Sequence, residues 1–310
     1  MKKSVIIPTL NRQTNLKKSI KAILDNSLLP DEIIIVEQWN LEKTKKILKD
    51  IDFDIKIFFL AQKSASKARN YWVKKSSWKI LFFIDDDLEI DKNYIKTAYN
   101  FFKKNKNVKI ISGKDKNAKL PKINFFKKLI RVLTYQDIFW DKRIVLKNGI
   151  NIVRLDFKGP IESEWASWTM VVKKEVFKKF EFPKNFLRWS FSEDVFFSYQ
   201  VYKYYWKKSI YFLPNLTFNH LKSKKNRIED FTELKMKIIY RFIFWKTEIY
   251  NNNFFYLLIF IYSNFFSSLF FIKNSKNKKE ALKIIISTYK FIFKNFKNFE
   301  KIDFNKFIFQ

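Results

Sequence analysis

The chain has 310 residues, 47% of them hydrophobic and 30% charged, and is therefore long enough to bury one large core or two modest ones. It contains no cysteine, which excludes a disulfide framework and thiolate metal sites, so a bound metal must use oxygen ligands or the single histidine, His220. No short apolar segment with a small-residue cleavage site follows Met1, and we expect a cytoplasmic amino terminus.

The formal net charge of +32 suggests binding to nucleic acid or to an anionic membrane. Lysine and arginine are spread along the whole chain, however, and no basic arm stands out. We therefore expect no specific nucleic-acid partner. The charge still favours attraction to an anionic membrane surface.

The first half of the chain alternates short apolar runs with helical periodicity, which is typical of βαβ units and a mostly parallel sheet. Helices are predicted between the strands, from apolar faces such as that of Leu16, Ile20 and Ile23. Polar strand ends would then meet at one edge of the sheet, where open α/β folds bind ligands. Strands are predicted at residues 4–8, 32–36, 54–60, 80–84 and 108–112.

Three consecutive carboxylates, Asp85, Asp86 and Asp87, follow the apolar run 80–84. Adjacent acids repel one another, so a cation is expected to hold them. At the end of a buried strand, a divalent metal that carries a diphosphate fits this position. A solvated acidic turn before a helix, with Asp91 as the helix cap, explains the same residues without chemistry.

Five short motifs, in order and with matching spacing, resemble family 2 glycosyltransferases with the GT-A fold. They are the strand and loop 4–12, Lys67-Ala68-Arg69-Asn70, the triplet Asp85-Asp86-Asp87 as an Asp-x-Asp signature, Glu193-Asp194 at the start of an amphipathic helix, and the strand 214–220. The similarity covers about residues 4–227. It implies an α/β GT-A catalytic domain over residues 1–227, followed by a helical appendage over residues 228–310 that is a candidate for membrane association.

The resemblance also implies a site for a nucleotide-sugar donor and a metal. Asp87 and His220 would hold Mn²⁺ or Mg²⁺, and mixed imidazole and oxygen ligation slightly favours Mn²⁺. Asp85 would reach the ribose, while Asp86 either orients its neighbours or faces solvent. A lone histidine such as His220 is also often purely structural. The donor would contact Pro8, Thr9, Asn11, Arg12, Glu37, Arg69, Asp85 and Asp86.

On the acceptor side, the resemblance assigns Asp194 as the catalytic base and Glu193 to acceptor binding or support. Favourable charge at a helix N-terminus accounts for both acids without catalysis. Trp165, Trp168 and Trp189 offer surfaces for stacking on a sugar, although core packing explains most tryptophans in a chain this aromatic. We retain Trp168 as an acceptor contact.

The composition changes beyond Arg227. Ile238, Phe242 and Trp245 predict an amphipathic helix, and residues 249–272 carry no charge over a length that can span a bilayer. Asparagine and serine interrupt this run and both flanks are basic, contrary to the positive-inside rule. We expect an interfacial appendage at the inner face of the cell membrane, with a helical cap on the catalytic domain as the alternative. A last helix, predicted at 281–296, suits either role.

These observations predict a metal-dependent, inverting glycosyltransferase of the hexosyltransferase type. It would move a sugar from a nucleotide diphosphate sugar to a glycan or lipid-linked acceptor in surface polysaccharide synthesis. One alternative is a non-catalytic module of the same fold that binds sugar nucleotides or glycans. Another is a nucleotidyltransferase, although no glycine precedes Gly113 to form a glycine-rich phosphate loop.

Overall fold

The computed structural model describes residues 1–76, 78–120, 122–188, 190–221 and 230–310. The chain divides into two compact units, Met1–Leu120 with Leu155–Arg227 and Pro121–Arg154 with Ile228–Gln310. The predicted domain boundary at Arg227, the basic flank 222–227 and Trp189 lie outside the described residues.

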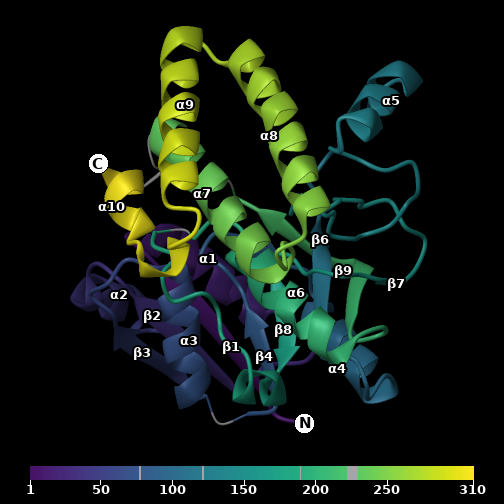
Figure 1. The fold of residues 1–310 in the computed structure, drawn as a ribbon. Helices are drawn as coiled ribbons and strands as arrows, with labels where there is room; N and C mark the ends of the chain where they lie inside the picture. Colours follow the sequence, from purple (N-terminus) through teal and green to yellow (C-terminus); the bar gives the residue numbers. More distant parts are fainter. Residues whose placement is uncertain (77, 121, 189, 222–229) are drawn as a thin grey trace. The chain divides into compact units, whose positions relative to one another are not determined.

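The first unit is built on one sheet, which has nine strands in the part of the chain that the structure describes (Figure 1). The strand order is β3-β2-β1-β4-β8-β6-β9-β5, and β7 pairs with β9. The strands are β1 (Lys3–Thr9), β2 (Glu32–Glu37), β3 (Ile55–Phe59), β4 (Ile80–Phe83), β5 (Leu88–Ile90), β6 (Ile110–Asp115), β7 (Ile161–Glu162), β8 (Met170–Lys173) and β9 (Ile210–His220).

Strands β3, β2, β1 and β4 run parallel, as predicted, and β6 pairs with β9 in parallel. Strands β5, β7 and β8 are antiparallel to their neighbours. The interpretation of Asp91 as a helix cap is wrong. Strand β5 follows the acidic triplet directly, and the next helix has Asn93 at its N-cap.

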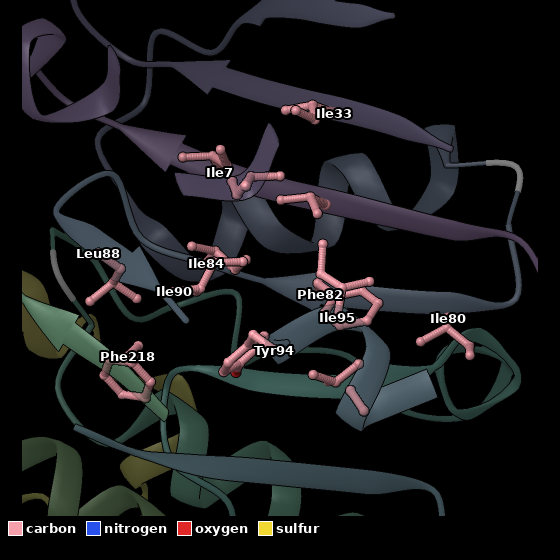
Figure 2. Close-up of a cluster of buried hydrophobic side chains, with 14 of the residues drawn as sticks. Ile7, Ile33, Ile80, Phe82, Ile84, Leu88, Ile90, Tyr94, Ile95 and Phe218 are labelled. Carbon is pink, nitrogen blue, oxygen red and sulfur yellow. The ribbon is translucent and has the colours of Figure 1, made fainter. Parts of the chain in front are cut away.

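Both faces of the sheet are covered at its centre, where the middle residues of β1, β2 and β4 are buried and mostly apolar. Side chains alternate along β1: Val5 and Ile7 join one buried cluster with Leu16 and Ile95, while Ile6 joins the other. Figure 2 shows part of the first cluster, where Tyr94 and Phe218 lie near Ile90. The helices of this unit are α1 (Gln13–Leu24), α2 (Leu41–Leu48), α3 (Ala65–Lys75), α4 (Tyr94–Lys104), the 3-10 helix η1 (Lys174–Lys178) and α6 (Glu193–Tyr205).

A bulge interrupts the pairing of β6 with β9. Ser112 lies opposite Phe212, but Lys114 lies opposite Thr217, so the register shifts at Gly113. A Cβ atom on Gly113 would lie 2.0 Å from the carbonyl oxygen of Leu216, and only glycine fits there. Beyond the bulge, β9 pairs with β5, which places His220 opposite Leu88. The bulge therefore brings the end of β9 beside the acidic triplet.

The second unit is helical. Trp245 of α7 stacks on Phe260 of α8 with ring centroids 4.1 Å apart, and Leu234 of α7 packs with Ile284 and Ile285 of α9. The helices predicted around 238–245 and 281–296 are confirmed. The unit contains α5 (Phe125–Leu133), α7 (Asp230–Glu248), α8 (Phe254–Asn274), α9 (Lys278–Lys294), the 3-10 helix η2 (Phe299–Lys301) and α10 (Phe304–Phe309).

Helix α8 turns its polar residues toward its own unit. Ser263 and Asn264 are buried: Asn148 donates to Ser263 Oγ over 2.6 Å, and the hydroxyl of Tyr289 donates to Asn264 Oδ1 over 3.2 Å. Phe260 is buried, but four other phenylalanines of α8 are exposed: Phe254, Phe255, Phe265 and Phe270, with Phe255 exposed by 71%. Among the described residues, α8 is the one helix long and apolar enough to cross a membrane. The polar residues that interrupt its apolar sequence thus hold it on the unit.

Candidate active site

The acidic triplet lies between β4 and β5, and hydrogen bonds from α1 hold its turn in place. Asp86 and Asp87 are buried, with exposures of 3% and 4%, so the turn is not solvated. Ser19 of α1 donates to the carbonyl oxygen of Asp86 over 3.0 Å, and its oxygen accepts the N–H of Leu88 over 3.1 Å. Because one hydroxyl bonds both sides of the turn, the carboxylates are held in a defined arrangement.

The loop after β1 supplies the positive charge nearest to the triplet. Asn11 has a φ of 55°, which turns the chain so that Arg12 faces the acids. Arg12 Nη1 lies 3.1 Å from Asp86 Oδ1 and 3.0 Å from Asp87 Oδ2. Thr9 Oγ1 donates to Asp86 Oδ2 over 2.6 Å. Burial raises the pKa of Asp86 to about 7, although Arg12 and Thr9 favour its charged form.

His220 reaches the same place from β9. Its Nε2 lies 3.4 Å from Asp87 Oδ2, and the N–H of Leu221 donates to the carbonyl oxygen of Asp87 over 2.9 Å. Burial disfavours ionised Asp87, but the bond with His220 and the charge of Arg12 outweigh it and lower its pKa. The same bond raises the pKa of His220. Asp87 is therefore a carboxylate at neutral pH.

The donor atoms at Asp87 and His220 fit a divalent cation in kind. A carboxylate oxygen and an imidazole nitrogen suit Mn²⁺ or Mg²⁺ once His220 is neutral. No group of three or more Asp, Glu or His side chains is arranged around one metal position in the described part of the chain. A cation held here would thus need water or substrate oxygens to complete its coordination.

Arg69 of α3 connects the triplet to the start of α6. The side chain is only 2% exposed; its Nη2 donates to Asp85 Oδ1 over 3.1 Å, and its Nη1 donates to Glu193 Oε1. Burial opposes its charge, but Glu193 and Asp85 raise its pKa. The next residue, Asn70, exchanges hydrogen bonds of 2.7 and 2.8 Å with the backbone of Phe182. The pair Arg69-Asn70 therefore both links the acids and anchors α3.

Glu193 and Asp194 open α6, after Ser192 with a φ of 64°. Asp194 Oδ1 accepts its neighbour's backbone N–H, that of Val195, over 2.8 Å. Burial raises the pKa of Asp194 to about 6, against the opposing effects of that N–H and of Arg69. Burial also raises the pKa of Glu193, again against Arg69. A helix N-terminus explains two acids here, but not their approach to Arg69 and Asp85.

The tryptophans separate into different environments. Trp168 is half-buried, and its ring centroid lies 5.4 Å from that of His220 and 5.6 Å from that of Phe218. Trp165 is 4% exposed and belongs to the interior. The structure therefore places Trp168 beside His220, whereas core packing accounts for Trp165.

Glu37 is placed at the expected sheet edge, but its carboxylate is occupied. Oε1 accepts the N–H groups of Gln38, Trp39 and Asn40, and Oε2 accepts the hydroxyl of Thr44. A donor contact would have to displace one of these bonds, so its predicted role stays a prediction. Pro8 is buried within β1, opposite Val36 of β2, and contributes no polar side chain.

Sequence reasoning missed two features of this region. Ser19 looks like an ordinary helix residue, because nothing in α1 shows that its hydroxyl will bond the triplet turn. Trp39 is 53% exposed in the loop after β2, with Lys63 Nζ 4.2 Å from the centre of its ring. A large exposed aromatic at a strand end is a recognisable signal for ligand stacking, and it was available from the sequence.

A mostly parallel sheet in a mixed α/β unit, with acids at the carboxyl end of a parallel strand, has the architecture of the GT-A fold. The structure is similar to residues 1–349 of TarS from S. aureus, with a TM-score of 0.57 and 19% identity, covering 93% of this chain and 81% of that one. It is also similar to GalNAc-T7, determined with UDP, GalNAc and Mn²⁺, with a TM-score of 0.55 and 14% identity over 79% of this chain and 50% of that one. The predicted GT-A fold is confirmed.

The sequence comparisons give the family. The family model described as glycosyl transferase family 2 matches residues 4–152. A 94-residue segment is 33% identical to the GalNAc(5)-diNAcBac-PP-undecaprenol beta-1,3-glucosyltransferase of Campylobacter jejuni, covering 29% of this chain and 30% of that protein. A 99-residue segment is 29% identical to the glycosyltransferase GlyA of Streptococcus pneumoniae, covering 31% of this chain and 14% of GlyA.

The chain thus spans less than a third of the length of these curated relatives. The match to glycosyl transferase family 2 over residues 4–152 agrees with the family that the motifs predicted, whereas the motifs at 193–194 and 214–220 lie beyond the matched range.

Proposed function

We propose that the protein transfers a sugar from a nucleotide diphosphate sugar to an acceptor hydroxyl, with inversion at the anomeric carbon. The observation that carries this proposal is the position of Arg69, whose guanidinium joins Asp85 of the triplet to Glu193 at the start of α6. One buried cation thus connects the acids expected at the donor with those expected at the acceptor. Both reactants would be aligned on one rigid frame.

On the donor side, Asn11 and Arg12 of the loop after β1 would meet the diphosphate, with Asp85 at the ribose. Arg12 already lies between Asp86 and Asp87, so its charge is positioned where phosphate oxygens would enter. Asp87 and His220 would hold Mn²⁺ or Mg²⁺. When bound, such a cation neutralises charge on the leaving diphosphate. The structure of GalNAc-T7, a protein of similar fold, contains UDP, GalNAc and Mn²⁺, which supports a divalent cation beside a nucleotide-sugar donor.

On the acceptor side, Asp194 would take the proton of the attacking hydroxyl. Its raised pKa of about 6 keeps it ionised at neutral pH while making it a better base than an exposed aspartate. Glu193, held by Arg69, would bind the acceptor or support Asp194. Trp168 would offer its half-buried ring to a sugar face.

The acceptor proposed is a glycan or a lipid-linked saccharide in surface polysaccharide synthesis. The Campylobacter jejuni relative is named for an undecaprenol-linked acceptor, which supports this class. The exposed phenylalanines of α8 support an interfacial position at the inner face of the cell membrane rather than a cap on the catalytic domain. We retain a catalytic domain within residues 1–227 and an appendage over residues 228–310, although Pro121–Arg154 is grouped with the appendage in the second compact unit.

The test is incubation of the full chain with a panel of nucleotide sugars and Mn²⁺ or Mg²⁺, followed by detection of nucleoside diphosphate and of glycosylated product. Release of diphosphate from one donor supports the proposal. Donor binding without turnover on any acceptor would identify a non-catalytic module. Release of pyrophosphate from a nucleoside triphosphate would identify a nucleotidyltransferase.

A further inference from the structure

Helix α5 has an apolar face that is largely exposed, with only Leu129 and Val132 half-buried. None of its nine residues is buried. Phe125 is exposed by 74%, Phe126 by 66%, Leu133 by 64% and Ile130 by 45%. An amphipathic helix of a water-soluble domain normally turns its apolar face to the core. Here the apolar face is the exposed one.

The charges of α5 lie on the opposite side. With about 100° of rotation per residue, the six apolar side chains fall within an arc of about 160°, and Lys127, Lys128 and Arg131 fall within the remaining arc. The helix contains no acidic residue. An aromatic and aliphatic face bordered only by cations is the pattern of a helix that lies in a membrane interface.

The loop after α5 fixes this orientation. Buried Asp137 lies 3.2 Å from Lys128 Nζ and 3.6 Å from Arg131 Nε, so the cationic side of α5 is tied to its own unit. In the same loop, Phe139 is 47% exposed and stacks on Phe125 with ring centroids 6.3 Å apart, and Trp140 is 69% exposed. The exposed surface therefore extends beyond the helix.

The end of α5 is also tied to α8. Tyr262 donates its hydroxyl hydrogen to the carbonyl oxygen of Leu133 over 3.2 Å, and Ser267 Oγ donates to Gln136 Oε1 over 2.8 Å. Both helices belong to the second unit (Figure 1). Each exposes phenylalanines and keeps polar groups against the unit.

We propose that α5, together with Phe139 and Trp140, is a second membrane-docking site, which inserts into the interface of an anionic phospholipid bilayer. It extends the membrane association proposed for α8 and is tested separately from it. Lys122, Lys127 and Lys142 are exposed around it, outnumber the one exposed acid beside Trp140, Asp141, and complement anionic headgroups. A second copy of the chain would bring these cations against one another, so charge favours the bilayer.

The test uses full-length protein and vesicles of phosphatidylcholine alone or with phosphatidylglycerol. Phe126→Ser combined with Leu133→Ser should weaken binding to the anionic vesicles at least about tenfold, because affinity follows the apolar area inserted. Leu29→Ser, at an exposed apolar position of the first unit, is the matched control and should change nothing. Lys127→Glu should weaken binding more than Lys17→Glu does. Lys17→Glu is the control, because it makes the same change of charge at an exposed position of α1.

A second measurement uses the absence of cysteine, which makes a single introduced thiol the only labelling position. A polarity-sensitive fluorophore on Phe126→Cys should shift to shorter wavelength on anionic vesicles, whereas the same label on Leu29→Cys should not. Unchanged emission at position 126 while the protein still pellets would show that α8 docks alone and would overturn the proposal. So would a change from dimer to monomer in the Phe126→Ser, Leu133→Ser variant without lipid. Donor turnover in detergent reports the proposed function independently.

Discussion

The two units differ most in the cluster of paired charges that the first one buries and in the apolar surface that the second one exposes. The first unit buries charge: Arg69, Asp86 and Glu193 are each under 5% exposed. The second unit buries Ser263 and Asn264 of α8 and exposes phenylalanines. Buried charges are tolerated when they are paired, and here Asp86 pairs with Arg12 and Glu193 pairs with Arg69. Extended apolar surface is tolerated only when it meets something other than water. The first unit thus has the buried charges expected of a site for a polar ligand, and the second has the exposed apolar surface that our membrane-docking proposal requires.

The largest effect expected is that of Asp87→Asn, which should reduce sugar transfer to background. The carboxylate charge is what a cation needs, and the amide keeps the shape without it. Release of nucleoside diphosphate measures the loss, with Asp50→Asn, an exposed position, as the control. Vesicle binding should be unchanged if the two units serve separate roles. Full activity of the variant, or of the unmodified protein in excess chelator, would remove the triplet from the mechanism.

Asp194→Asn should separate chemistry from binding within the first unit. Turnover should fall by about two to four orders of magnitude, the usual contribution of a positioned base. Calorimetry should show unchanged donor affinity, because Asp194 is proposed to act on the acceptor. Loss of donor affinity along with turnover would place this residue in the donor site or in the support of the fold.

Arg69→Met tests whether the buried charges depend on one another. Without the guanidinium, Asp85 and Glu193 lose their shared partner, and breaking a buried pair costs about 3–5 kcal/mol. Denaturant unfolding measures this change in free energy. Adding Glu193→Gln to Arg69→Met should recover part of the loss. A loss below about 1 kcal/mol, or no recovery, would mean that water already screens the pair.

The smallest effect is a dependence on pH. Because burial raises the pKa of Asp194 to about 6 and the base must be ionised, kcat/KM should fall about tenfold per unit below that pH. A raised carboxyl pKa also means that the stability contributed by this group is complete below pH 3.8 and is lost as pH rises through about 6. In Asp194→Asn, the residual activity should therefore no longer fall below about pH 6. The substitution should also stabilise the protein more at pH 8 than at pH 4. A flat profile would exclude Asp194 as the base.

Local patterns in the sequence predicted the parallel half of the sheet well. Runs of β-branched residues such as 32–36 have few alternatives to a buried strand, and β2 spans Glu32–Glu37. The pairing of Leu88 with His220 could not be predicted from local sequence patterns. Strand β5 has three residues, and its partner, the end of β9, lies about 130 residues later in the sequence. The two strands pair beyond the register shift at Gly113. Short antiparallel strands such as β5, β7 and β8 depend on such long-range pairing rather than on their own periodicity.

The candidate site shows the same division. Motif spacing pointed to Asp87 and His220, and the structure places them 3.4 Å apart. Spacing could not show that backbone N–H groups of the following loop would bond the carboxylate of Glu37, because that depends on how the chain turns after β2. Helix α5 was overlooked for a different reason. Its apolar periodicity is clear in the sequence, but only the structure shows that no core covers it.

The bulge at Gly113 limits how the sequence can change. The chain contains three glycines in 310 residues, and at this one a methyl group would meet the carbonyl oxygen of Leu216. Even alanine would push β9 away from β6, and His220, at the end of β9, would move with it. Because the chain has so few glycines, few positions can be affected in this way. A substitution at Gly113 would displace His220 from the site without changing any residue of the site itself. Random mutagenesis screened for activity should therefore find Gly113 among the intolerant positions, although it carries no functional group.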